Sequence, residues 1–284
     1  MEVYVHSKND LKKNICYYLI CLIPFYLYGF YKNGYLLYSR GLINFFGMFK
    51  IFYLLGINLI IYFIIKRKIN FDLLFLSMFV IPLFMSVNIN YFIYIIGIFL
   101  YVFLSKYYEN ISIVILILSL FGSFTNKMES LNIFDYSILD MFFGRNISGI
   151  GTSNIIMSLV LLLILSFSSL YKKDVSISSL LTYILLCILF DRSLLLVGNA
   201  YFSIIIIASW SIISPLLTKG EIIYGIVIGL LGFLFMKYIN MYYGMVMAIA
   251  IVSVILEVFP WVEKRFLKKT SKKLSIVFSG FNDI

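Results

Sequence analysis

A glycine-rich stretch directly before an apolar run is the part of this sequence best suited to holding a ligand. Gly149 and Gly151 are followed by Thr152 and Ser153, and the residues after them are largely apolar. A hydroxyl at this place can cap a helix, and the free backbone N–H groups of a helix N-terminus can hold an anion such as a phosphate. A glycine turn with a cap also occurs in helices that bind nothing, so both interpretations stay open.

Other side chains that could do chemistry are few. The sequence contains no Walker A loop, no dinucleotide-binding fingerprint, no HExxH pair and no cysteine pair at zinc spacing. Lys50 lies inside an apolar stretch, where it either extends its amine to a polar boundary or marks a break between a short helix and a longer one. Glu257 lies near the end of another apolar stretch and can pair with Lys264 or Arg265. We interpret both residues as structural.

The elements that carry these residues are predicted to lie in a membrane. Hydrophobic residues make up 62% of the 284 residues, charged residues make up 13%, and the mean hydropathy is +1.01. A soluble domain carries about 25% charged residues and could not bury this much apolar surface. We therefore predict an all-α polytopic membrane protein that is surrounded by the lipid bilayer.

The net charge of +10 arises from 23 Lys and Arg residues against 13 Asp and Glu residues. The basic residues gather in short loops and at the two ends of the chain, which is the pattern that orients membrane proteins. We therefore expect no nucleic-acid partner. An orientation with both termini in the cytoplasm assigns sixteen basic residues to the inside and six to the outside.

Ten apolar runs are candidate spans, and several are short enough to predict tilted, broken or re-entrant helices. Within the ninth run, Gly225, Gly229 and Gly232 put small residues near one face, which predicts close packing on a neighbouring helix. The ten runs lie at 15–31, 42–65, 72–88, 91–105, 111–124, 153–171, 175–190, 193–213, 222–237 and 242–259.

We predict a single integral membrane domain over residues 1–284. Its longest loop separates two groups of five spans, and because five is odd, the two groups must run in opposite directions through the membrane. This plan permits an inverted repeat, which is common among proteins that move solutes across membranes. The predicted parts are a first half at about 1–124, an outer loop at about 125–152, a second half at about 153–263 and a basic cytoplasmic tail at 264–284.

The order and spacing of proline, glycine and aromatic residues over most of the chain resemble a known family. The family contains RnfD of the Rnf electron-transport complex and NqrB of the sodium-pumping NADH:quinone reductase. The similar stretches are residues 4–9, Pro24, residues 137–144 followed by 149–153, residues 214–231 and residues 243–249.

The resemblance implies a ten-span subunit of an Rnf- or Nqr-like complex in the bacterial cytoplasmic membrane. It also implies FMN, joined to a threonine on the outer side by a phosphoester and attached by a flavin transferase. The family's Asp-x-x-[Ser/Thr]-Gly-Ala-Thr motif corresponds to residues 119–125, which keep Thr125 and differ at the Asp, Gly and Ala positions. The FMN phosphate would then lie near the glycine-rich stretch at 149–153.

The expected function is that of a non-autonomous subunit of a redox-driven ion translocase, which passes electrons through a bound flavin and couples them to movement of Na⁺ or H⁺. An alternative is a transporter or channel that keeps the fold without the flavin. A membrane glycan polymerase would also have many spans and a large outer loop. It predicts clustered Arg, His or Glu residues in that loop, where Arg145 is the sole arginine and histidine is absent.

Overall fold

The computed structural model describes residues 8–66, 73–105, 110–125, 138–144, 149–168, 171–210, 215 and 218–256. All regular elements within these residues are helical, which confirms the predicted all-α class. The α-helices are α1 (Lys8–Gly29), α2 (Leu36–Ser39), α3 (Phe45–Met48), α4 (Lys50–Lys66), α5 (Leu73–Phe84), α6 (Tyr91–Leu104), α7 (Ile111–Thr125), α8 (Ile138–Phe142), α9 (Ile155–Leu165), α10 (Lys173–Phe190), α11 (Gly198–Phe202), α12 (Thr218–Tyr238) and α13 (Gly244–Leu256). Two π-helical segments, η1 (Phe30–Tyr35) and η3 (Ser203–Ala208), and a 3₁₀ segment, η2 (Arg192–Leu196), continue them.

Each of the ten predicted apolar runs contains helix. Three helical segments have the length and composition needed to cross a membrane, namely Lys12–Ser39, Lys173–Phe190 and Thr218–Tyr238, and shorter apolar helices accompany them. Large apolar side chains cover their outward faces, as at Phe92 and Leu181, which are 70% and 64% exposed. Because water would not tolerate so much exposed apolar surface, these faces are those of a helical membrane protein.

The second predicted run, 42–65, is divided between two helices. The short α3 ends before Phe49, whose backbone leaves the helical conformation, and α4 then begins at Lys50. The Lys50 amine donates a hydrogen bond to the Ile89 carbonyl at 2.8 Å and lies 5.0 Å from the centre of the Tyr91 ring. Lys50 therefore marks the break between a short helix and a longer one, one of the two roles predicted for it.

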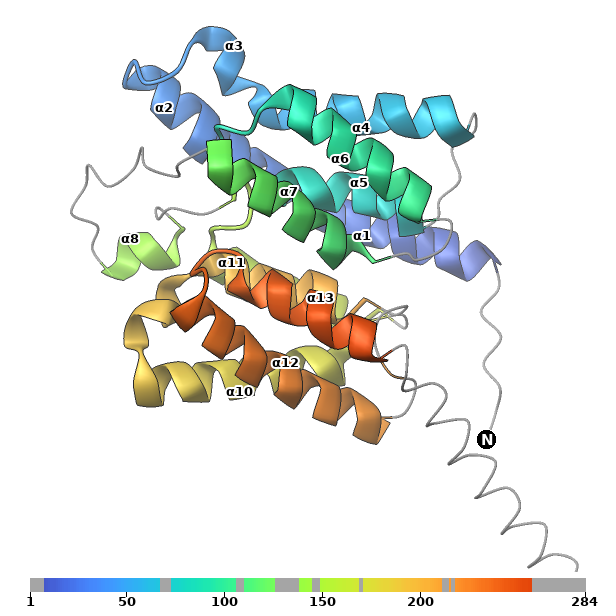
Figure 1. The fold of residues 1–284 in the computed structure, drawn as a ribbon, viewed down its shortest axis with the longest axis vertical. Helices are drawn as coiled ribbons and strands as arrows, with labels where there is room; N and C mark the ends of the chain where they lie inside the picture. Colours follow the sequence, from blue (N-terminus) through green and yellow to red (C-terminus); the bar gives the residue numbers. More distant parts are fainter. Residues whose placement is uncertain are drawn as a thin grey trace, which may run out of the picture.

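The helices form two groups, with α1 to α7 in the upper part of Figure 1 and α10 to α13 in the lower part. In the first group, α1 packs on α5, α4 packs on α5 and α6, and α6 packs on α7. In the second group, α9 packs on α11, α10 packs on η3 and α12, and α12 packs on α13. The first, second, third, fourth and fifth helices of each group thus make corresponding contacts.

The two groups meet through corresponding helices. The first helices, α1 and α9, pack on each other, and so do the last helices, α7 and α13. Self-matching contacts of this kind also occur between units that are related by a two-fold axis. In Figure 1, α1 begins at the end of the bundle at which α13 ends, on the right of the view, and α2, α3 and α8 lie at the opposite end.

The third helix of each group is short and buried. Nearly all side chains from Leu74 to Phe84 in α5 are buried, and so is every residue from Gly198 to Ala208 in α11 and η3. A helix that is apolar on all sides needs neighbours on all sides. Because both helices are buried along nearly their whole length, their terminal backbone groups lie inside the protein and must find partners there.

The predicted glycine seam on α12 is confirmed. A Cβ atom on Gly229 would lie 2.7 Å from the Ser179 carbonyl oxygen of α10, and one on Gly225 would lie 2.7 Å from the Val175 carbonyl oxygen. Gly232 faces the other neighbour, α13, through Met245. The glycines therefore let α12 approach both helices more closely than any other residue would.

Candidate functional site

The glycine-rich stretch lies between the two groups of helices, at the carbonyl end of α5. The backbone N–H of Ile150 donates to the Met85 carbonyl at 2.8 Å, and that of Gly151 donates to the Leu83 carbonyl at 3.0 Å. From η1, the side-chain amide of Asn33 donates to the Ile150 carbonyl at 2.7 Å. The stretch thus provides the hydrogen bonds that a helix ending inside a membrane protein requires.

Glycines allow the backbone segments to meet at this junction. A Cβ atom on Gly29 of α1 would lie 2.9 Å from the Ile150 carbonyl oxygen, and one on Gly198 of α11 would overlap the Ser153 carbonyl. Gly144 has a φ of +78°, a conformation that favours glycine, and packs against the backbone of Ser153 as well. Helix α1 and the buried α11 are therefore in backbone contact with a single short segment, which leads directly into α9.

The predicted capping residues are wrong, because Asn154 caps α9 in their place. Asn154 has an extended backbone, and its side chain accepts a hydrogen bond from the Met157 N–H at 2.9 Å. A cap must directly precede the first helical residue, which is Ile155. Thr152 and Ser153 come too early in the chain for this role.

The two displaced hydroxyls are buried without partners. Thr152 Oγ1, Ser153 Oγ and Asn199 Oδ1 accept and donate no hydrogen bond within the part of the chain that the structure describes. All three residues are completely buried. The Asn199 amide nitrogen does have a partner, the Tyr242 carbonyl at 2.6 Å. Buried oxygens without partners are unfavourable by about 1–3 kcal/mol each, so each of these three oxygens calls for an explanation other than side-chain packing.

Three phenylalanines close the junction on its apolar side. Phe202 of α11 lies edge-on to Phe25 of α1, with ring centres 4.9 Å apart, and edge-on to Phe84 of α5, with ring centres 5.3 Å apart. All three rings are buried. Edge-to-face contacts of this kind add about 0.5–1.5 kcal/mol beyond the burial of area, so the cluster fixes the two short helices against α1.

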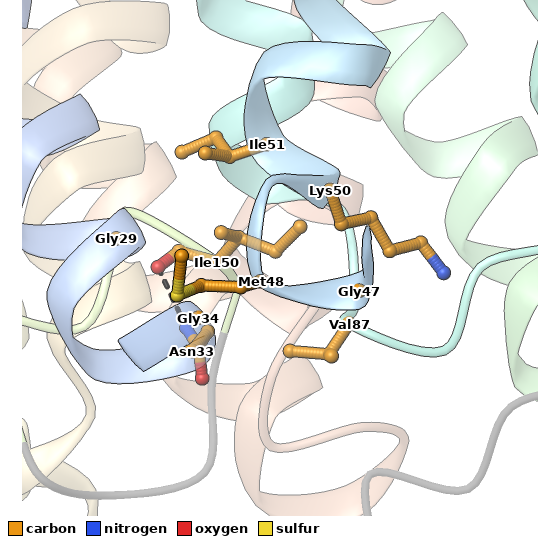
Figure 2. Close-up of a pocket in the computed structure, with 9 residues that line it drawn as sticks. All are labelled: Gly29, Asn33, Gly34, Gly47, Met48, Lys50, Ile51, Val87 and Ile150. Carbon is orange, nitrogen blue, oxygen red and sulfur yellow. Dashed lines mark hydrogen bonds between the residues drawn. The ribbon is translucent and has the colours of Figure 1, made fainter. Parts of the chain in front are cut away.

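A small cavity lies beside the junction. Its volume is about 10 Å³, enough for a single water molecule. Figure 2 shows Asn33 and Gly34 of η1, Met48 and Ile150 around it, with the hydrogen bond from Asn33 to Ile150 dashed and the Lys50 amine directed away from the cavity. The cavity is too small for a phosphate or a flavin.

The structure describes the side chains at the glycine-rich stretch, but not the side chain of Thr125. Thr125 is the last residue of α7, and its side chain lies outside the described part of the chain. At the glycine-rich stretch, Gly149, Gly151, Thr152 and Ser153 are buried, and the N–H groups of Ile150 and Gly151 are already donated to α5. Two donors expected for an FMN phosphate are therefore taken, and both the phosphate contact and the attachment at Thr125 stay predictions.

Sequence reasoning missed two amide residues and one ion pair. Asn33 and Asn199 contact the junction and its neighbours, and an amide side chain beside or inside an apolar run could have indicated them. Elsewhere, Lys172 lies 3.5 Å from Glu221 at the start of α12 and also donates to the Pro215 carbonyl. The ion pair with Glu221 therefore connects the segment between α9 and α10 to the start of α12.

Part of the chain matches a known protein family. The model of the NQR2, RnfD, RnfE family matches residues 114–268, which is more than half of the chain. The chain belongs to this family. No curated protein sequence matches the chain. The family match covers the glycine-rich stretch and all helices of the second group, and it confirms the resemblance found in the sequence. As an NQR2, RnfD, RnfE family member, the chain is a membrane subunit of the Rnf/Nqr type.

Proposed function

We propose that this chain is the ion-conducting membrane subunit of an Rnf/Nqr-type electron-transport complex in the bacterial cytoplasmic membrane, with both termini in the cytoplasm. The supporting observation is the junction at the carbonyl end of α5, where the two groups of helices meet. There, α5 ends and α11 begins inside the protein, beside buried oxygen atoms that have no hydrogen-bond partner among the described residues. The subunit would not act alone, because the electrons must come from other subunits.

The arrangement supports this proposal by analogy with transporters of other folds. Many transporters bind ions between two inverted repeats, where broken helices expose backbone carbonyls near the middle of the membrane. In this chain, the third helix of each group is short, and α5 presents the carbonyls of Leu83 and Phe84 to the glycine-rich stretch. An electron-transfer step that shifts one group against the other would change these contacts.

FMN would supply the electron transfer in this proposal, and the chain would supply binding and orientation. Thr125 is the proposed attachment residue. The glycine-rich stretch fits the phosphate poorly, because the N–H groups of Ile150 and Gly151 already donate to α5. We therefore place no step of the ion pathway on the flavin. A transporter or channel without flavin is the second candidate, and the same junction supports it.

Purification of the full chain with an affinity tag from its native membrane tests the proposal. We expect several other membrane subunits to copurify with the chain, together with the visible absorption of flavin or iron–sulfur centres. A chain that purifies alone, or with copies of itself, and without a redox centre would contradict the proposal and favour the flavin-free transporter.

A further inference from the structure

We propose that an anionic phospholipid of the cytoplasmic leaflet binds to the first group of helices. One acyl chain would lie in an apolar groove between α1 and α4, and the headgroup would meet Lys12 and Lys66. The groove shares no lining residue with the glycine-rich stretch, and lipid binding there goes beyond the proposed redox role.

The groove has an apolar lining. Its volume is about 320 Å³, and its walls are six residues of α1, Phe52 and Leu55 of α4 and Phe79 of α5. Tyr26 of α1 carries the only polar side-chain group among these residues, and its hydroxyl donates to the Phe79 carbonyl at 2.6 Å. The lining therefore offers no free side-chain donor to the polar ring of a ligand, whereas an acyl chain needs none.

Aromatic rings join the two walls of the groove at one end. Helices α1 and α4 both pack on α5, and Phe79 of α5 lies between them in the groove. Near the start of α4, Phe30 of η1 contacts Phe52, with ring centres 5.6 Å apart, and Phe49, with ring centres 5.4 Å apart. This end is predicted to face the outside. An acyl chain would enter from the opposite end, where α1 begins and α4 ends, on the right of Figure 1.

A lysine lies in line with each wall at the end of the groove that is predicted to face the cytoplasm. Lys12 precedes Leu19 by about two helical turns and Ile23 by about three, so it shares a face of α1 with the groove residues. Lys66 follows Leu55 by about three turns on α4. Both lysines are exposed. An anionic headgroup at this end would therefore meet one positive charge from each wall.

The length of the groove face fits the depth of a single leaflet. Lys12 and Ile23 are separated by about 16 Å along α1, at 1.5 Å for each residue. One leaflet contributes half of a hydrocarbon core about 30 Å thick, which is about 15 Å. An acyl chain whose headgroup meets Lys12 would thus end near Ile23, inside the groove.

The test is thermal unfolding of the purified full chain in detergent with added dioleoyl phosphatidylglycerol, which is anionic, or dioleoyl phosphatidylcholine, which has no net charge. We expect saturating phosphatidylglycerol to raise the Tm of the wild type by about 3 °C more than phosphatidylcholine does. In Lys12→Gln, the phosphatidylglycerol concentration for half of this shift should rise about fivefold. Lys173→Gln is the matched control, because Lys173 is exposed at the start of α10 in the other group and should keep the wild-type response.

A second variant tests the groove itself. In Ile23→Trp, the larger side chain would occupy the space of the acyl chain, so we expect the response to phosphatidylglycerol to be lost. Leu181→Trp is its control, because Leu181 is 64% exposed on α10 and should keep the response. If Lys12→Gln does not fold, Lys66→Gln takes its place, with the same expected rise in concentration.

An equal Tm of the wild type in the two lipids would overturn the site, and so would a wild-type response in Lys12→Gln or in Ile23→Trp. Extraction of an isoprenoid quinone from the purified wild type, but not from Ile23→Trp, would assign the groove to a different ligand and would also overturn it. The proposed function is tested separately by copurification, so an intact redox complex without a response to phosphatidylglycerol would reject this site and leave that function standing.

Discussion

The backbone N–H of Gly151 donates to the carbonyl of Leu83 at 3.0 Å, and this hydrogen bond joins the start of the second group of helices to the end of the third helix of the first. The two residues are far apart in the sequence. Their hydrogen bond gives the Leu83 carbonyl a donor that lipid could not supply. It also removes from the glycine-rich stretch a donor that an anion would need. The glycine-rich stretch therefore offers an anion fewer free N–H donors than its sequence suggests.

The close packing at the junction predicts a strong effect of a single methyl group. In Gly198→Ala, the new Cβ would overlap the Ser153 carbonyl, and because both segments are buried, neither can move away without a cost. We expect a loss of about 1–3 kcal/mol in the free energy of unfolding, measured as a lower Tm in detergent. Gly56→Ala on α4 is the control, since a methyl group there meets no atom within 4 Å, and it should leave stability unchanged or raise it. Equal effects of the two substitutions would contradict the described packing.

The seam between α10 and α12 predicts a second loss of stability. Gly229→Leu would force its side chain into the backbone of α10 at Ser179, so we expect lower yield and a lower Tm. The control is Ile226→Leu on the same helix, because Ile226 is 43% exposed on an outward face and a leucine there can remain in lipid. A Gly229→Leu protein as stable as the control would place that face of α12 against lipid.

The distribution of basic residues predicts the orientation of the bundle. In a variant without the native cysteines, a cysteine at Ser193, in the exposed connection after α10, should react with a membrane-impermeant thiol reagent in whole cells. A cysteine at Lys219, exposed at the start of α12, should react with the same reagent after the cells are opened. The reversed pattern would place both termini outside and would overturn the predicted topology.

The flavin attachment predicted by the family resemblance has its own test. The Thr125 hydroxyl is needed for the phosphoester, so Thr125→Val should abolish in-gel flavin fluorescence in cells that contain the flavin transferase. Thr182→Val, which removes a hydroxyl on α10, should keep the fluorescence. Fluorescence that survives Thr125→Val would show attachment at another residue, and a wild-type chain without any flavin mass would reject covalent FMN.

The sequence predicts the helices better than it predicts the junction. The ten apolar runs correspond to helices because a segment in lipid must be apolar over nearly its whole length, and this requirement is local. The two groups of five follow from the same runs and the position of the longest loop. The break before Lys50 was one of two open interpretations, because a long side chain that reaches a polar boundary would give the same pattern.

The geometry of the junction depends on residues that are distant in the chain. The sequence of the glycine-rich stretch is equally compatible with exposed and with buried N–H groups, and the choice is made by Leu83 and Met85 at the end of α5. Similarly, the cap at Asn154 depends on the residue at which α9 begins. No local motif shows that α9 begins at Ile155 and not one or two residues earlier. The oxygens of Thr152 and Asn199, which have no hydrogen-bond partner among the described residues, become evident when the packing of several helices around them is known.

The most direct test of the central claim is ion uptake into inverted membrane vesicles from cells that express this chain naturally. NADH and a reduced iron–sulfur carrier, supplied in turn as electron donors, should drive uptake of Na⁺ or H⁺ into vesicles of the wild type. We predict that deletion of the gene abolishes the donor-dependent part of this uptake and that the wild-type gene restores it. Donor-dependent uptake of unchanged rate in the deletion strain would contradict the account of this chain as a subunit of a redox-driven ion translocase.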